Sequence, residues 1–100
     1  IWSLEEGNTL FLAEDIVAHM YAINHISYHS NGHYFVTCSM DKSIKIWDSC
    51  TFKLIRVIDK GRYAGHGTSV NKLLSMPNKN SLISCSDDRT ISVWDINFSK

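Results

Sequence analysis

The chain of 100 residues contains an internal repeat, and a repeat limits the possible folds more than any other feature of a sequence. When the sequence is shifted by 47 residues, segment 37–48 lies over segment 84–95. Both segments begin with a hydroxyl residue followed by Cys-Ser, continue through an aspartate, and end in Trp-Asp. His19 lies over His66 at the same shift. Because the shift is constant from the histidine to the last aspartate, the pattern indicates a duplicated unit.

A third, partial copy stands at the N-terminus, where Trp2 repeats the tryptophan near the end of each full unit. Ser3 follows it in place of the usual aspartate. We therefore expect residues 1–15 to form the end of a preceding unit with its outer strand. Residues 16–58 are expected to form a first full unit, and residues 59–100 a second unit that lacks its outer strand.

Each unit has the pattern of short strands separated by turns, with β-branched and aromatic residues in the strand segments. The predicted strands are 23–28, 34–39, 43–47 and 52–58 in the first unit, 70–74, 81–86 and 90–94 in the second, and 9–13 near the N-terminus. Four antiparallel strands repeated at roughly 40–50 residues is the period of a β-propeller blade. The predicted fold class is therefore all-β, with two four-stranded propeller blades of a larger ring.

The duplicated motif resembles the WD-repeat β-propeller family. In that family a Gly-His dipeptide, an aspartate in a tight turn and a Trp-Asp ending mark each repeat. This chain carries the motif twice, as Ala18-His19, Asp41 and Trp47-Asp48, and as Gly65-His66, Asp88 and Trp94-Asp95. The match covers nearly the whole chain and departs from the family at Ala18, where glycine is usual.

The resemblance implies a hydrogen-bonded tetrad of His, Ser/Thr, Asp and Trp within each blade. The two tetrads would be His19, Thr37, Asp41 and Trp47, and His66, Ser84, Asp88 and Trp94. A buried imidazole and a buried indole N–H each cost free energy unless they are paired, and a hydroxyl can both donate and accept. A Ser-His-Asp set also suits a hydrolase, but the set recurs in each repeat beside a tryptophan that a catalytic triad does not need. We therefore expect a structural role.

The resemblance also implies a protein-interaction scaffold that presents the loops of one face to a protein or peptide partner. Segment 59–64 is the least repeated part of the chain and is predicted to be a loop on that face. The candidate partner-binding residues are Asn24, Met40, Arg62, Tyr63, Asn71 and Asp87. Two alternatives stay open at this point: a blade portion of a propeller enzyme with an active site in the central channel, and a purely structural fragment.

The composition of the chain argues against several other classes of protein. Ten basic and ten acidic side chains give a formal net charge of +0, so nothing in the sequence suggests a nucleic-acid surface. No apolar run approaches the roughly 20 residues of a membrane-spanning helix, and the first residues do not have the pattern of a signal peptide. The 3 cysteines form no CxxC pair, which favours a reducing, cytoplasmic setting.

Metal and cofactor sites are not expected. His25, His29 and His33 recur every four residues, but the repeat places Lys, Met and Asn at the equivalent positions of the second unit. No pair of carboxylates or histidines outside the tetrads recurs. We therefore expect no metal site, no cofactor and no catalytic activity.

Two blades leave an apolar sheet face open on each side, and these faces are predicted to be lined by residues such as Ile44, Ile46, Ile91 and Val93, or by their strand neighbours. Repeat arrays of this kind need several units for stability. The first residue is not Met, which suggests a piece of a longer chain. We expect either the remaining blades of a parent chain or other copies of this chain to close the ring.

Overall fold

The computed structural model describes residues 2–4, 10–12, 15–29, 32–63, 65–76 and 81–96. The strands are β1 (Trp2–Leu4), β2 (Leu10–Leu12), β3 (Ile23–Tyr28), β4 (Tyr34–Ser39), β5 (Ile44–Asp48), β6 (Leu54–Ile58), β7 (Val70–Ser75), β8 (Ser81–Ser86) and β9 (Ile91–Asp95). One short helix, α1 (Lys60–Tyr63), follows β6.

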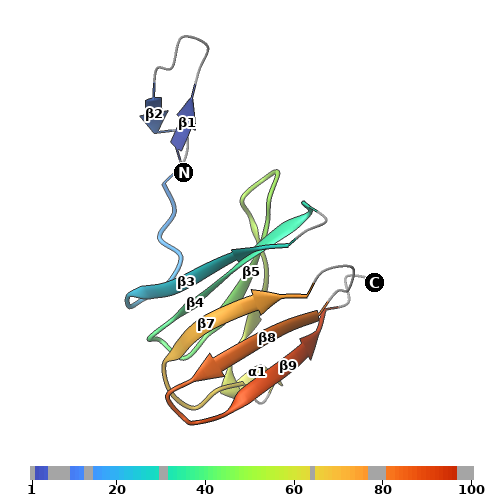
Figure 1. The fold of residues 1–100 in the computed structure, drawn as a ribbon. Helices are drawn as coiled ribbons and strands as arrows, with labels where there is room; N and C mark the ends of the chain where they lie inside the picture. The colour runs from blue at the N-terminus through green and yellow to red at the C-terminus, as the bar shows by residue number, and fades with distance from the viewer. Residues whose placement is uncertain are drawn as a thin grey trace.

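The strands form antiparallel sheets in chain order, as Figure 1 shows. A first sheet has the order β3-β4-β5-β6, and a second has the order β7-β8-β9 within the described residues. The hairpin β1-β2, with Trp2 opposite Leu12, lies apart from both sheets (Figure 1). The prediction of an all-β fold is confirmed.

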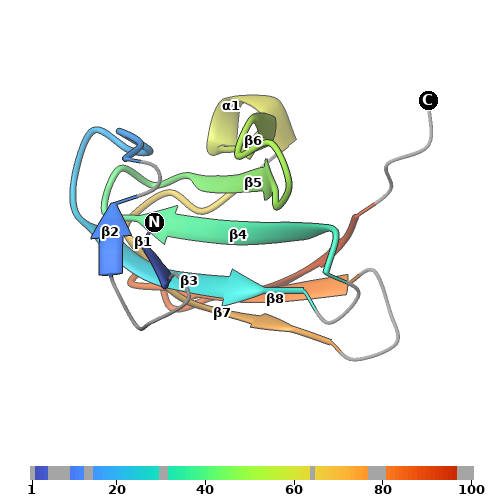
Figure 2. The same cartoon turned by 90° about the horizontal axis from the view of Figure 1, so that it is seen from above.

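The two larger sheets pack face to face, and the core lies between them (Figure 2). The first sheet contributes small and β-branched side chains from its central strands, and the second contributes side chains from β7 and β8. The main core residues are Val36, Cys38, Ile44 and Ile46 of the first sheet and Val70, Leu73 and Leu82 of the second. Strand alternation brings these side chains to the shared interface.

Of the four residues predicted by name for the open faces, two lie on an open face. Ile44 and Ile46 are buried between the sheets, whereas Ile91 and Val93 at the equivalent positions of the second sheet are exposed. Ile44 and Ile46 themselves do not line an open face, because the second sheet covers the face of the first sheet that carries them. The uncovered face of the first sheet is the opposite one, which carries Ile26.

The segment predicted to be a loop at 59–64 contains the single turn of helix α1, so that prediction was wrong. The connection is closed by the Gly65 N–H, which donates to the Asp59 carbonyl at 3.1 Å. Gly61 lowers the helix propensity of this stretch, which is why the sequence favours a loop. Within the described part of the chain, no helix is long and apolar enough to cross a membrane.

Candidate functional site

The first sheet contains a buried network centred on His19. Its Nε2 lies 2.7 Å from Thr37 Oγ1, and its Nδ1 lies 2.9 Å from Asp41 Oδ2. Trp47 Nε1–H donates to the same threonine oxygen at 3.0 Å. The structure therefore brings together the four residues that the sequence predicts for this tetrad.

The second sheet repeats the network around His66. Its Nε2 lies 2.8 Å from Ser84 Oγ and its Nδ1 lies 3.1 Å from Asp88 Oδ2. Trp94 Nε1–H donates to Ser84 Oγ at 2.9 Å. The same four positions are thus joined in both sheets, across turns that lie 22 residues from each histidine.

The hydrogen-bond directions in each network follow from its two ends. An indole N–H can only donate and a carboxylate can only accept. Thr37 Oγ1 accepts from Trp47, which leaves its own proton available for His19 Nε2, and this arrangement requires the tautomer with Nε2 unprotonated. Nδ1–H of His19 donates to Asp41. In this assignment the chain of donors runs from tryptophan through the hydroxyl and the imidazole to the aspartate.

The aspartates are held in their charged form by several donors. Burial raises the pKa of the Asp41 carboxyl, but hydrogen bonds from the Ser43 hydroxyl and His19 outweigh it and hold that pKa below its usual range. For Asp88 the hydrogen bond from the Thr90 hydroxyl has the largest effect. The backbone N–H of Thr90 and the His66 ring add to it, and the pKa of Asp88 lies well below the ordinary value.

Sequence reasoning missed two further members of each network. Ser43 and Thr90 donate to the turn aspartates from two residues downstream, through both hydroxyl and backbone N–H. Ser39 and Ser86 donate through Oγ to the carbonyls of Ala22 and Ser69, each at 2.8 Å. The sequence contains a signal for these members, because a hydroxyl residue occupies each of these positions in both units.

The Ser84–His66–Asp88 arrangement has the order of a catalytic triad, but its surroundings differ from one. Ser84 is only 1% exposed, and its oxygen already accepts a hydrogen bond from Trp94. A nucleophilic serine needs access to a substrate carbonyl. In this structure Ser84 Oγ has no such access.

The ends of the two sheets next to these turns form a surface that we call the loop-end face, made of residues 20–22, 40–42, 67–69 and 87–89. Met20, Tyr21 and Met40 are exposed there. They are close in space because Met40 N–H donates to the Ala22 carbonyl at 3.1 Å and Ser39 Oγ donates to the Tyr21 carbonyl at 3.3 Å. Gly67, Thr68 and Asp87 occupy the equivalent positions of the second unit.

The candidate partner-binding residues have different environments. Asn24 joins the two sheets, because its Nδ2 donates to the Val70 carbonyl at 2.8 Å and to Ser69 Oγ at 3.0 Å. Asn71 Nδ2 donates to Asp87 Oδ1 at 2.7 Å on the second sheet. Met40 is exposed on the loop-end face. Arg62 and Tyr63 lie in α1, and their side chains lie outside the described residues.

The histidines outside the tetrads have separate neighbours. His25 Nδ1 accepts a hydrogen bond from Leu73 N–H at 3.0 Å, which joins the two sheets. The His29 ring stacks on Tyr34 with centroids 4.5 Å apart. Among the residues that the structure describes, no group of three His, Cys, Asp or Glu side chains is placed to hold a metal ion.

The fold and the two equivalent networks define a WD-repeat protein, and the comparisons with known proteins agree. The model of the family described as "WD domain, G-beta repeat" matches residues 12–48 and 55–95. The chain belongs to this family, and its two larger sheets are β-propeller blades.

Two similar proteins show how much of this chain, and how much of each similar protein, is aligned. The nuclear distribution protein PAC1 of Debaryomyces hansenii is 32% identical over 88 residues, which cover 74% of this chain and 16% of that protein. The crystal structure of the computationally designed Ika4 protein matches with a TM-score of 0.69 and 28% identity. That match covers 86% of this chain and 48% of the designed chain. This chain therefore spans well under two thirds of either protein.

Proposed function

We propose that this chain is a non-catalytic interaction scaffold whose loop-end face binds a protein or peptide partner, in a reducing, cytoplasmic setting. The two tetrads serve as the structural frame of that face. Each ties the segment before the first strand of a blade to the turn between its second and third strands. Fully satisfied buried networks of this kind hold a surface in one geometry, which favours binding because less conformational entropy is lost.

The observation that carries the proposal is the difference between the two blades at equivalent positions of this frame. Met20, Tyr21 and Met40 expose apolar side chains on the first blade, where the second presents polar or small residues. Met and Tyr are enriched at protein interfaces, and Met adapts its shape to a partner. The loop-end face is therefore asymmetric, with an apolar patch on the first blade and a polar one on the second. We expect an apolar side chain of the partner to rest on the first blade.

The partner surface can be tested with a library of random peptides displayed on phage. Peptides selected on the immobilised chain are expected to lose about tenfold or more in affinity when Met40→Asp is introduced, because burying a carboxylate against an apolar anchor is unfavourable. Leu54→Asp is the matched control, since Leu54 is exposed on β6, away from this face. Peptides that are insensitive to Met40→Asp but lost with Leu54→Asp would refute the loop-end face as the binding surface.

The enzyme alternative requires a separate test because the Ser84–His66–Asp88 geometry resembles a triad. An alkyl fluorophosphonate labels serines that are both activated and accessible. We expect no labelling of the folded chain, because Ser84 is buried and accepts from Trp94. Labelling that disappears in Ser84→Ala would show that this network is reactive, and the non-catalytic part of the proposal would then be wrong.

A further inference from the structure

Three side chains of β3 form hydrogen bonds with β7 in the described part of the chain, and β3 and β7 run side by side (Figure 2). Asn24 Nδ2 donates to the first carbonyl of β7 at 2.8 Å, and Ser27 Oγ lies 3.1 Å from Ser75 Oγ. Between these two contacts, His25 Nδ1 accepts from the Leu73 N–H at 3.0 Å. Of the three side chains, only the imidazole can change its charge near neutral pH.

The His25 ring binds Leu73 through a nitrogen that carries no proton. A backbone N–H can only donate, so Nδ1 is unprotonated and the neutral ring carries its proton on Nε2. A protonated imidazole has a proton on both nitrogens and accepts at neither. Protonation of His25 therefore breaks this hydrogen bond and turns two N–H groups toward each other. Leu73 is buried, and a buried backbone N–H without an acceptor is costly.

The titratable groups around the His25 ring include no carboxylate among the described residues. Lys72 of β7 and Cys85 of β8 line the same hollow as His25, together with apolar side chains and Ser84. Cys38 lies opposite His25 in the register of β3 and β4, and burial raises the pKa of its thiol to about 11. The charged group in this hollow is therefore the Lys72 ammonium, which cannot accept a hydrogen bond. A protonated His25 ring has no counter-charge there to hold it in place.

His25 differs in this respect from the two tetrad histidines. Nδ1 of His19 and Nδ1 of His66 lie 2.9 and 3.1 Å from an aspartate oxygen, to which each donates. Nδ1 of His25 meets a donor instead. The second unit has Lys72 at the position equivalent to His25, so this acceptor is a feature of the first blade of this chain and not of the repeat.

We propose that His25 is a pH-sensitive clasp between the two blades. The neutral ring accepts from Leu73 and holds β3 against β7, and a proton on Nδ1 opens the bond. The amide of Asn24 and the hydroxyl of Ser27 do not titrate, so the interface loosens at His25 without coming apart. The contribution of the clasp is therefore present while the ring is neutral, and it is lost as the pH falls through the range in which the ring takes up its proton.

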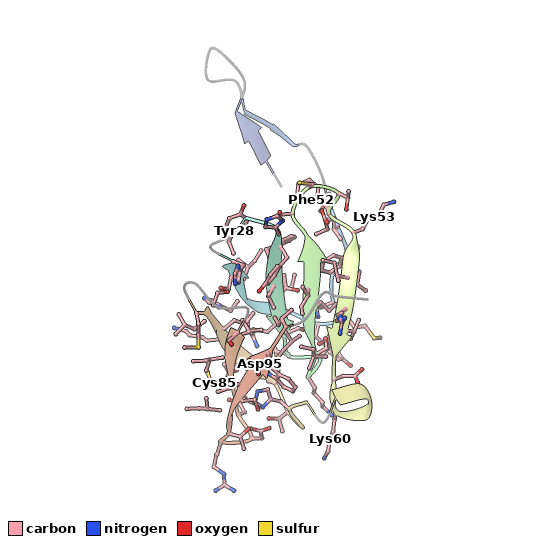
Figure 3. All side chains as sticks on the ribbon, turned by 90° about the vertical axis from the view of Figure 1, so that its right-hand side faces the viewer. Tyr28, Phe52, Lys53, Lys60, Cys85 and Asp95 are labelled. Carbon is pink, nitrogen blue, oxygen red and sulfur yellow. The ribbon has the colours of Figure 1, made fainter. Side chains whose placement is uncertain are left out.

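The position of the clasp relates it to the loop-end face. β3 begins at Ile23, directly after residues 20–22 of that face. It ends at Tyr28, which lies at the opposite end of the first sheet from Lys60 of α1 (Figure 3). His25 is the third residue of the strand. The clasp thus lies near the loop-end face and ties its two parts together while the ring is neutral.

Nuclear magnetic resonance of the 100-residue chain between about pH 8 and pH 5 tests the clasp. The Leu73 amide resonance should shift with the same midpoint as the ring carbons of His25. Its protection from hydrogen exchange, corrected for the intrinsic effect of pH, should fall by about 5-fold or more. Asp41 and Asp88 stay charged over this range, because the pKa of each carboxyl lies below its ordinary value. A Leu73 amide that does not follow the titration of His25 would overturn the proposal.

His25→Asn removes the titration and keeps an acceptor, because an asparagine side-chain oxygen accepts at any pH. In this variant the Leu73 amide should keep its position and its protection across the range. His33→Asn is the matched control, since His33 is an exposed histidine in the turn before β4. That control should leave the titration of Leu73 unchanged. Continued titration of Leu73 in His25→Asn, or its loss in His33→Asn, would refute the clasp.

The tautomer of His25 gives a second readout that needs no variant. Nitrogen-15 spectra at the alkaline end of the range should place the ring proton on Nε2. This is the opposite of the tautomer expected for His19 and His66, so the three rings can be compared in one spectrum. A proton on Nδ1 of the neutral His25 ring would contradict the proposal, because that nitrogen could not then accept from Leu73.

Discussion

His19 Nδ1 lies 2.9 Å from Asp41 Oδ2, although the two residues are 22 positions apart in the chain. This bond fastens the segment that leads into β3 to the turn between β4 and β5. The same carboxylate oxygen also faces the Met20 N–H at 3.4 Å. Asp41 thus contacts the backbone of Met20 and directly follows Met40 in the chain, so it lies beside both exposed methionines of the loop-end face.

Removing this aspartate should destabilise the first blade. In Asp41→Ala the buried His19 Nδ1–H loses its carboxylate partner and keeps Ser43 Oγ at 3.1 Å, while the Ser43 hydroxyl and N–H lose the acceptor that they share. Loss of buried hydrogen bonds of this kind costs about 1–3 kcal/mol. The free energy of unfolding in urea measures the effect. Asp87→Ala is the control, because Asp87 is exposed and its carboxylate accepts from the Asn71 amide in an exposed hydrogen bond outside the network. Equal effects of the two substitutions would contradict the structural role of the first network.

Stability should fall in acid because the folded chain holds the pKa of both Asp41 and Asp88 below the ordinary value. The unfolded carboxyls have a pKa of about 3.9 and take up protons first as the pH falls. The contribution of these groups is therefore complete above about pH 5 and is lost progressively below about pH 4.

Urea midpoints measured across this range should decline steeply for the unmodified chain. The decline should be shallower for the double variant Asp41→Asn and Asp88→Asn, which has no charge to lose at these positions. Asp87→Asn serves as the control and should keep the steep decline. An unchanged slope in the double variant would mean that other carboxyls dominate the acid response.

Gly65 should not tolerate a side chain. A Cβ at this position would lie 2.9 Å from the Asp59 carbonyl carbon and 3.1 Å from the Asp59 oxygen, and these backbone atoms cannot move without opening the connection. Gly65→Ala should therefore cost about 1–3 kcal/mol of unfolding free energy. Gly67→Ala is the matched control, because its nearest neighbour would be the end of Lys60 at 3.7 Å. We expect that control to stay within about 0.5 kcal/mol of the unmodified chain.

The cysteines should differ in reactivity. Burial raises the pKa of the Cys38 thiol to about 11, against a smaller lowering by a backbone hydrogen bond at His25. The thiolate is the reactive form, so Cys38 should resist iodoacetamide at neutral pH until the chain unfolds. Cys50 is exposed and should react first. Mass spectrometry with Cys50→Ser as control checks the order, and early labelling of Cys38 would contradict its burial in the core.

The strands could be predicted from the sequence because the repeat aligns two independent copies of each pattern. The segments 23–28, 34–39 and 81–86 have the predicted bounds. Helix α1 could not be predicted, because its sequence is not repeated at 12–17 and contains Gly61. The helix depends on how the connection closes between Asp59 and Gly65, which is a tertiary effect.

The composition of the two networks could be predicted from the resemblance, but the surfaces could not. Ile44 and Ile91 occupy the same position of the repeat and have the same sequence pattern. Their burial differs because only one of them has a neighbouring blade in this chain. Ser43 and Thr90 were missed because a hydroxyl beside a turn aspartate is also common in unrelated turns. The exposed Met20 and Tyr21 give no signal beyond their lack of repetition.

The central claim is that both blades are built on one chain of donors from tryptophan through a hydroxyl and a neutral imidazole to an aspartate. Nitrogen-15 nuclear magnetic resonance of the histidine side chains near neutral pH tests this directly, because it reads the tautomer of each ring. We expect His19 and His66 both to carry their proton on Nδ1, with Nε2 unprotonated. A proton on Nε2 in either ring would contradict the account, since the hydroxyl could not then donate to it.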